Sequence, residues 1–225
     1  MIKFDQVTKS YPGAGNALEN LSFEIDRGEM VFLTGPSGAG KSTLLKLIAL
    51  IERPTRGQII VDGRNVGRMP IRDVPKHRRE IGVVFQDNKL LTDRSAFDNV
   101  ALPLTIAGLN DREIARRVRA SLDQVGLLKK ERKTPLALST GEQQRIGIAR
   151  AIVARPQIVI ADEPTGNLDP WLSLEIMKLF SRFNEIGVTL LIATHDHDLI
   201  SRLSGRRIHL KDGQVVEPED EALVF

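Results

Sequence analysis

Cysteine is absent from the 225 residues, which excludes disulfide bonds, thiolate metal sites and cysteine nucleophiles. Long apolar runs are missing as well. Stretches such as residues 47–51 fall far short of the roughly 18 residues that a membrane-spanning helix needs. The first residues show no basic segment followed by an apolar one, so we expect no signal peptide. We do not expect the chain to cross a membrane by itself. The lack of cysteine fits a protein of a reducing compartment.

A strong charge of one sign is also missing. The 32 basic and 29 acidic residues leave a net charge of +3, which is too small to indicate nucleic-acid binding. Two segments depart from this balance, since residues 112–133 are rich in arginine and lysine and residues 217–221 are acidic. Both are typical of solvated surface. The alternative for the basic segment is a surface that faces anionic lipid or an acidic partner.

The composition is that of a globular protein, with 41% hydrophobic and 27% charged residues. Alternating or continuous apolar residues predict strands at 2–4, 21–25, 30–34, 58–61, 81–85, 158–161 and 188–193. Helical patterns are found at 40–51, 111–125, 141–155 and 170–184. The outline is an α/β core with a β-rich opening and a helical insertion in the middle of the chain.

The most informative motif reads GPSGAGKST, which is Gly35, Pro36, Ser37, Gly38, Ala39, Gly40, Lys41, Ser42 and Thr43. It matches the phosphate-binding pattern G-x-x-x-x-G-K-[ST] between a predicted strand and a predicted helix. Glycines let consecutive N–H groups point at one anion, and the helix N-terminus adds its positive dipole. Lys41 can reach the β- and γ-phosphates of a nucleotide, and the Ser42 hydroxyl can bind Mg²⁺. The motif predicts nucleoside triphosphate binding and leaves kinases, GTPases and motors open.

Two carboxylates, Asp162 and Glu163, end the predicted strand 158–161. Ligands of open α/β sheets bind at the carboxyl ends of the strands. Asp162 can therefore hold Mg²⁺ through water, and Glu163 can orient or deprotonate an attacking water. The alternative, a strand that ends in two solvated acids, is minor downstream of a phosphate-binding loop.

The stretch Leu138 to Arg145, LSTGEQQR, resembles the LSGGQ signature of the ATP-binding cassette (ABC) ATPases, and the chain follows that family's order. The resemblance implies a P-loop NTPase nucleotide-binding domain with a RecA-like parallel-sheet core, an N-terminal antiparallel β subdomain and a helical subdomain. We expect a single domain over residues 1–225. Its β-rich part is expected at about 1–30 and 57–85, its helical part at about 87–156, and its core in the remainder.

The same resemblance implies ATP and Mg²⁺ as cofactors and assigns roles to single residues. The catalytic residues would be Lys41, Gln86 of the Q-loop, Glu163 and the switch histidine His195. ATP would be bound by Tyr11, which stacks on adenine in the family, by residues 35–43, and by Ser139, Gly141 and Glu142. The Mg²⁺ ligands would be Ser42, Gln86 and Asp162. The sequence Asn167-Leu168-Asp169 matches the family's D-loop, and Trp171, the single tryptophan, follows it.

Thr140 departs from the family pattern, which usually has glycine at this position. A β-branched residue does not easily adopt a positive φ. Either this position is not left-handed in this chain, or the loop around it is adjusted. Because Ser139 and Gly141 remain, we expect the phosphate contact of the signature to survive.

Further stretches resemble one subfamily, FtsE of bacterial cell division, among them residues 32–35, 37–48 and 98–104. This implies a peripheral ATPase at the cytoplasmic face of the bacterial inner membrane. It would form a homodimer on ATP binding, because the signature of one copy completes the ATP site of the other. An FtsX-like transmembrane protein would dock in a groove at about 87–109, and the complex would regulate cell-wall hydrolysis.

Three alternatives remain open at this point. ATPases of lipoprotein-release and macrolide exporters share the ADEPTGNLD motif, so they are the nearest alternative. A nucleic-acid-repair or chromosome ATPase is less favoured, because the chain has no sustained heptads and no zinc-binding cysteines, and no direct nucleic-acid contact is expected. A P-loop kinase is disfavoured by the signature motif.

Overall fold

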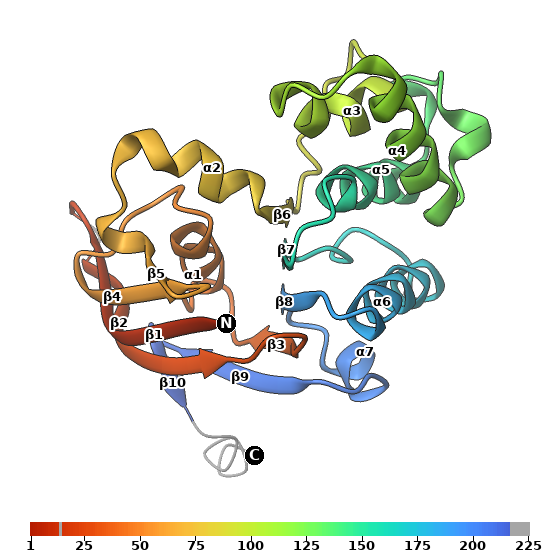
Figure 1. The fold of residues 1–225 in the computed structure, drawn as a ribbon. Coiled ribbons are helices and arrows are strands. Elements are labelled where there is room, and N and C mark those ends of the chain that lie inside the picture. Colours follow the sequence, from red (N-terminus) through yellow and green to blue (C-terminus); the bar gives the residue numbers. More distant parts are fainter. Residues whose placement is uncertain (14, 217–225) are drawn as a thin grey trace.

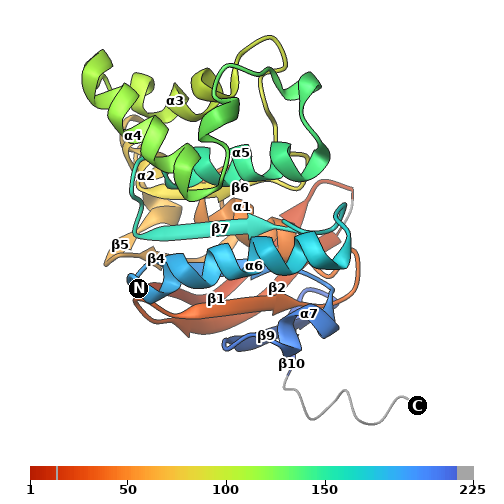
Figure 2. The ribbon, with the colours of Figure 1, turned by 90° about the vertical axis from the view of Figure 1, so that its right-hand side faces the viewer.

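The computed structural model describes residues 1–13 and 15–216, so the acidic segment 217–221 lies outside the described residues. A larger sheet divides the molecule. A second, smaller sheet and the short helices near the N-terminus lie on one side of it, and the longer helices lie on the other (Figures 1 and 2).

The smaller sheet is antiparallel, with the strand order β2-β1-β4-β5. Its strands are β1 (Ile2–Tyr11), β2 (Gly15–Ile25), β4 (Arg56–Val61) and β5 (Arg64–Asn65). The strands predicted at 2–4, 21–25 and 58–61 are confirmed, but β1 and β2 are much longer than predicted. The register of β1 shifts after Phe4, next to Gln6 with its φ of 50°. A bulge of this kind interrupts the alternation of apolar and polar residues.

The larger sheet has six strands in the order β10-β9-β3-β8-β7-β6. Its strands are β3 (Met30–Thr34), β6 (Ile81–Val84), β7 (Ile158–Asp162), β8 (Thr189–Ala193), β9 (Arg206–Lys211) and β10 (Gln214–Val216). All neighbouring pairs are parallel except the hairpin of β9 and β10. The α/β core is confirmed, and the hairpin is an element that the sequence patterns did not predict.

One boundary needs correction. Residues 57–85 were assigned as a whole to the β-rich part, but β6 pairs in parallel with β7 and forms the edge of the larger sheet. The reason is burial, because Ile81, Gly82 and Val84 are buried in the core sheet. A short continuous apolar run is what a strand of a parallel sheet requires.

The four helices predicted at 40–51, 111–125, 141–155 and 170–184 are present with small shifts at their ends, one more lies in the predicted helical part, and two short helices at 74–79 and 197–201 were not predicted. They are α1 (Lys41–Ile48), α2 (Val74–Arg79), α3 (Ala96–Ile106), α4 (Asp111–Gln124), α5 (Thr140–Ile152), α6 (Pro170–Glu185) and α7 (His197–Ser201). Single 3₁₀ turns lie at Val66–Arg68, Ile71–Asp73, Leu128–Lys130 and Pro135–Ala137. Side chains cap several helix starts, as Ser95 does for α3 and Asn110 does for α4. These caps explain why the helices begin where they do.

Two hydrophobic cores lie on the two faces of the larger sheet. Alternate residues of β3 point to opposite cores: Val31 and Leu33 pack with α1 and the smaller sheet, whereas Phe32 packs with α3 to α6. The loops that follow β3, β6, β7 and β8 all leave the sheet at the carboxyl ends of its strands. This edge is where open parallel sheets bind ligands.

Within residues 1–13 and 15–216, no helix combines the length and the apolar character that a membrane span requires.

Candidate nucleotide-binding site

The glycine-rich loop 35–43 joins β3 to α1, as the motif predicts. Gly35, Gly38 and Gly40 have positive φ values of 136°, 83° and 102°. A Cβ atom at Gly35 would lie 2.1 Å from the carbonyl oxygen of Leu210, and one at Gly40 would lie 2.6 Å from that of Ala17. These positions therefore need glycine both for their backbone angles and for close approach.

Lys41 is the first residue of α1, and its side chain turns back over the loop. Its Nζ donates hydrogen bonds to the carbonyl oxygens of Gly35 at 2.6 Å and Pro36 at 3.0 Å. The Oε1 atom of Glu163 lies 4.0 Å from the same Nζ. Pro36, Ser37 and Gly38 are exposed at the mouth of the loop, so an anion can approach the ammonium group there.

Asp162 and Glu163 lie at the carboxyl end of β7, beside the start of α1. Burial raises the pKa of Asp162, while the hydrogen bond from the Ser42 hydroxyl opposes this effect. Glu163 has a left-handed backbone with a φ of 45°, and its N–H donates to the carbonyl of Ala193 at 2.9 Å. A left-handed non-glycine residue is strained, and active sites are among the places where such residues cluster.

His195 follows β8 and completes a row of three side chains. Its Nδ1 lies 3.0 Å from the Oε2 atom of Glu163. The Glu163 side chain is only 13% exposed, whereas the His195 ring is 68% exposed. The row Lys41, Glu163 and His195 thus brings an ammonium group, a carboxylate and an imidazole together at one edge of the sheet.

Tyr11 and Gln86 lie at the ends of strands in different parts of the molecule. Tyr11 ends β1, and the Lys9 ammonium lies 4.7 Å from the centroid of its ring. Gln86 is exposed just after β6. Within the described part of the chain it makes no hydrogen bond or ion pair to Ser42 or Asp162, so its role stays a prediction.

The signature segment forms the start of α5. Ser139 is the N-cap, and its hydroxyl accepts from the N–H of Glu142, whose carboxylate in turn accepts from the N–H of Ser139. Lys130 donates to the same carboxylate and, with the backbone bond, holds the pKa of Glu142 below its usual range. This reciprocal cap fixes where the helix begins.

For Thr140 the sequence left two alternatives, a position that is not left-handed or an adjusted loop. In the structure Thr140 is the first helical residue of α5, and its φ is not positive. The position is not left-handed in this chain. The next residue, Gly141, has a different constraint: a Cβ there would lie 2.1 Å from Cδ2 of Leu172 in α6. Asp169 of the D-loop caps α6 by accepting from the N–H of Leu172 at 3.0 Å. The signature and the D-loop are therefore packed together.

The structure does not bring the signature to the glycine-rich loop of the same chain. Helix α1 packs in the core shared with the smaller sheet, whereas α5 packs in the core on the other face of the larger sheet. Figure 1 shows the two helices on either side of this sheet. One chain therefore carries the two parts of the predicted ATP site at separate places.

Arg150 is a residue near the site that the motifs did not reveal. It lies in α5, and its guanidinium donates to the carbonyl oxygens of Asn88, just after Gln86, and of Lys89 at 2.8 Å. Burial lowers its pKa. An arginine inside a helical pattern carries no local signal for this contact, which ties the Q-loop segment to the signature helix.

The donor set at Ser42 and Asp162 fits Mg²⁺. The hydroxyl and the carboxylate are oxygen donors that hydrogen-bond to each other at the end of β7, and Mg²⁺ prefers oxygen ligands from a few side chains together with phosphate and water. No group of three or more His, Cys, Asp or Glu that could hold a metal lies within residues 1–13 and 15–216. The two oxygen donors of Ser42 and Asp162 suit an ion that nucleotide phosphates also hold.

Known ATP-binding proteins are similar to this chain over nearly its whole length. Residues 18–166 match the protein family described as ABC transporter. The cell division ATP-binding protein FtsE of Escherichia coli (strain K12) is 56% identical over 215 residues, which cover 96% of this chain and 97% of that protein. FtsE of Bacillus subtilis (strain 168) is 46% identical over 219 residues, which cover 97% of this chain and 96% of that protein.

Solved structures agree with the sequence comparison. One of them is the ATP-binding cassette MJ0796, described as a dimer in a post-hydrolysis state bound to ADP and Pi. It matches with a TM-score of 0.89 and 37% sequence identity, and the match covers 96% of this chain and 97% of that chain. The structure of cbiO1 from Clostridium perfringens, part of the ABC transporter complex cbiONQ, also has a TM-score of 0.89, with 32% identity and 99% and 90% coverage. The chain therefore belongs to the ABC transporter family of ATP-binding proteins, and within it to the FtsE group.

Proposed function

We propose that this chain is the ATP-hydrolysing subunit of an FtsEX-type complex, which couples ATP binding to the control of cell-wall hydrolysis in cell division. The observation that carries the enzymatic part is the row Lys41, Glu163 and His195 at the carboxyl end of the parallel sheet. The high identity to FtsE proteins over nearly the whole chain supports the biological part.

Phosphate binding rests on the loop 35–43 and the N-terminus of α1. The positive φ angles of its glycines turn the backbone so that N–H groups can face an anion. Lys41 exchanges its hydrogen bonds to Gly35 and Pro36 for phosphate oxygens, which carry more charge than carbonyl groups. Tyr11 supplies an aromatic face for adenine.

Hydrolysis needs a group that accepts a proton from water. Glu163 is the candidate base, since its carboxylate is shielded from solvent, lies 3.0 Å from His195 and is held in place by a backbone bond to Ala193. His195 positions the carboxylate and can contact the terminal phosphate. When bound, Mg²⁺ neutralises phosphate charge, and Ser42, Asp162 and Gln86 are the residues that would hold it.

A complete site requires a second copy of the chain. Ser139 and the N-terminus of α5 are separated from the glycine-rich loop by the larger sheet, so they serve the ATP bound to a partner. Two nucleotides, each at about 100 times its dissociation constant, stabilise the closed pair by about 5.4 kcal/mol. Moving a pair from mostly open to mostly closed requires about 5.5 kcal/mol. ATP that binds only the closed pair therefore supplies nearly all of the free energy that closure requires.

The membrane partner docks in an apolar groove of about 850 Å³ between the core and the helical part. Phe85 and Ile81 line one side, and Leu102, Leu104 and Ile106 of α3 line the other. This groove overlaps the predicted docking segment 87–109 and adjoins the Q-loop. An FtsX-like transmembrane protein would hold the chain at the cytoplasmic face of the inner membrane as a peripheral subunit.

The experiment is a pull-down of tagged Glu163→Gln protein from solubilised membranes with ATP and Mg²⁺, followed by identification of the co-eluting proteins. We expect an FtsX-like membrane protein together with an activator of cell-wall hydrolases. The variant Ile106→Glu, which places a charge in the groove, should lose this partner while it still binds ATP. Co-elution of a lipoprotein or drug exporter subunit, or of DNA, would overturn the division role.

A further inference from the structure

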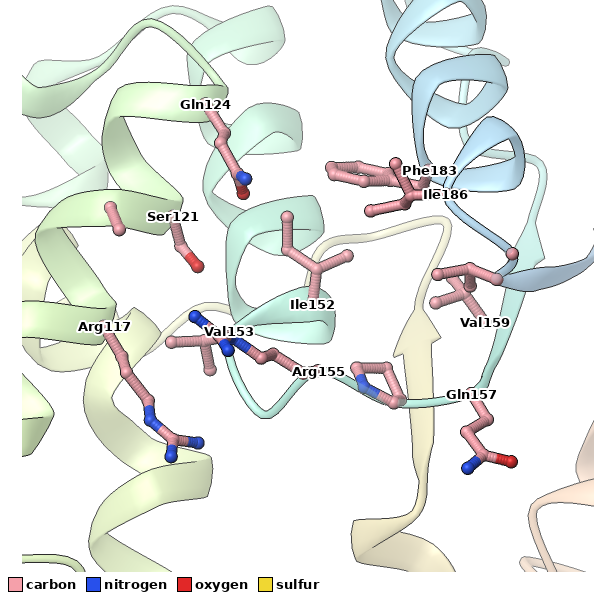
Figure 3. Close-up of a pocket in the computed structure, with 14 residues that line it drawn as sticks. Arg117, Ser121, Gln124, Ile152, Val153, Arg155, Gln157, Val159, Phe183 and Ile186 are labelled. Atoms are coloured by element: carbon pink, nitrogen blue, oxygen red, sulfur yellow. The ribbon is translucent and has the colours of Figure 1, made fainter.

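A second cavity, of about 490 Å³, is lined by no residue of the glycine-rich loop (Figure 3). It is enclosed by α4 and the end of α5 on one side and by β7 and the end of α6 on the other. Val159, at the start of β7, lines it, whereas Asp162 of the ATP site is at the other end of that strand. No residue assigned to the binding of ATP or Mg²⁺ lines this cavity. No residue of α3, where we propose that the membrane partner docks, lines it either.

One wall of the cavity is apolar. It is formed by Ile152, Val159, Phe183 and Ile186, which Figure 3 shows facing the same space. Ile186 is 76% exposed, an unusual exposure for a large aliphatic side chain next to a concave surface. A cavity of this size falls within the range of about 300–1,000 Å³ that small-molecule sites occupy, and such sites are mostly apolar with a few polar groups.

The opposite wall carries hydrogen-bonding side chains that have no partner in the described part of the chain. Ser121 is only 6% exposed, yet its hydroxyl makes no hydrogen bond there. The Gln124 amide and the Arg155 guanidinium are likewise without a side-chain partner among these residues. In Figure 3 the three side chains point from α4 and the end of α5 into the cavity. Of the three residues only Ser121 is buried, whereas Gln124 and Arg155 are exposed, so a ligand in the cavity would find three hydrogen-bonding groups without partners among the described residues.

The charge on this wall is positive. Arg117 is paired with Glu113 at 2.6 Å, but Glu113 is also shared with Arg116, so two guanidinium groups face one carboxylate. Arg155 adds a charge with no carboxylate partner among the described residues. Arg155 is also left-handed, with a φ of 56°. This conformation belongs to the end of α5, since the N–H of Arg155 donates to the carbonyl of Ile152 at 2.8 Å and helices commonly end in a left-handed residue.

We propose that this cavity binds a small amphipathic anion, which has one carboxylate or phosphate monoester group on an apolar body. The anionic head would accept hydrogen bonds from Arg155 and Ser121, and the apolar body would lie against Phe183 and Ile186. Because the cavity joins the helical part of the chain to the core, a bound anion bridges the two. The proposal does not depend on the membrane partner or on ATP hydrolysis.

The first test is calorimetric titration of the full-length chain with octyl phosphate below its micelle-forming concentration. Octanol lacks the charge and inorganic phosphate lacks the apolar body, so each should bind at least tenfold more weakly. Octanoate, titrated in parallel, distinguishes a carboxylate-binding from a phosphate-binding site. Equal binding of octanol and octyl phosphate would overturn the proposal, because the basic wall would then contribute nothing.

Two variants locate the binding. Arg155→Gly removes the guanidinium and relieves the left-handed backbone, so it should fold with an unchanged or higher midpoint of thermal unfolding. Its affinity for octyl phosphate should fall about tenfold or more, as expected when a charged hydrogen bond is lost. Ser121→Leu fills the cavity and should also abolish binding.

Two controls separate this site from other surfaces. Arg112→Gln removes an exposed charge of α4 that does not line the cavity, and Ile106→Ser alters the apolar groove; both should leave octyl phosphate affinity unchanged. Wild-type affinity in Arg155→Gly, or loss of binding in Ile106→Ser, would place the anion elsewhere and overturn the proposal.

Discussion

At the scale of single residues, Glu163 concentrates the chemistry of the site. Its left-handed backbone, with a φ of 45°, costs on the order of 1–3 kcal/mol, which the surrounding structure must offset. The backbone bond to Ala193 and the contacts to Lys41 and His195 all fix the direction of its carboxylate. The sequence motif identified this residue, but no motif could reveal the strained backbone that aims it.

Glu163→Gln should keep ATP binding and lose hydrolysis, because the amide preserves the shape of the side chain but cannot accept the proton of water. We expect the rate of phosphate release to fall by about 10²–10³. The matched control is Glu175→Gln, which changes a partly exposed glutamate of α6 that pairs with Lys178 and should hydrolyse ATP normally. A normal rate in Glu163→Gln would move the base to another group, with His195 as the nearest candidate.

Lys41→Ala should weaken ATP binding about ten- to hundredfold, the range expected when one or more hydrogen bonds to a charged group are lost. The change also removes the bonds that tie the side chain to Gly35 and Pro36, so the loop itself is loosened. Equilibrium binding of a fluorescent ATP analogue measures the effect. Lys129→Ala, on the surface of the helical part, serves as the control, and equal affinities in both variants would contradict the role of Lys41.

At the scale of elements, the contact between α5 and α6 sets the geometry of the signature. Thr140 begins α5 in an ordinary helical conformation, so the family's glycine is not needed there. Gly141 has a different constraint, since the Leu172 side chain occupies the space in which a side chain of residue 141 would lie. From the sequence alone, the two positions could not be told apart, because the reason lies in a side chain about thirty residues further along the chain.

Gly141→Ala should destabilise the chain by about 1–3 kcal/mol, the usual cost of overpacking. Shortening the neighbour in the double variant Gly141→Ala/Leu172→Ala should restore part of this loss, since the added methyl group then has room. Urea unfolding of the two single variants and the double variant gives the coupling. Strictly additive effects would show that the two side chains do not compete for this space.

The two sheets show what local patterns can predict and what they cannot. The glycine-rich loop and its flanking strand and helix were predicted because their signal is local. The hairpin of β9 and β10 was missed because the charged residues Arg206, Arg207 and Lys211 interrupt the apolar pattern of a strand. The pair Asp212-Gly213, a typical hairpin turn, was the available signal. The sheet to which β6 belongs was assigned wrongly, because a run of four residues does not specify which strand will pair with it. Pairing partners are long-range properties that no window of sequence contains.

At the scale of the whole molecule, pairing of two copies should be visible through Trp171. Its side chain is 69% exposed, and it lies next to the D-loop at the start of α6. ATP should change the tryptophan fluorescence of Glu163→Gln protein, with a midpoint that depends on protein concentration. An unchanged spectrum, while light scattering reports dimers, would show that this surface stays exposed to solvent in the pair.

The buried His77 makes global stability depend on pH. Its ring lies between α1 and α2, where Nε2 contacts the carbonyl of Ile48 at 2.7 Å and burial lowers the pKa of the ring. The unfolded chain therefore binds a proton that the folded chain excludes, so stability is lost as the pH falls below the ordinary histidine pKa of about 6.5. Urea unfolding between pH 7.5 and pH 5 should show this loss, and His77→Gln should reduce it. Equal slopes in both proteins would contradict the assignment.

The position of β3 in the larger sheet has a consequence for protein synthesis. This strand carries the glycine-rich loop, yet its two neighbours are β8 and β9, which end at Ala193 and Lys211. Gly35 itself rests against the backbone of Leu210. A chain that emerges from the ribosome at about 5–20 residues per second makes β3 early and must wait for its partners. The nascent protein therefore acquires its capacity to hold ATP only as the last strands emerge.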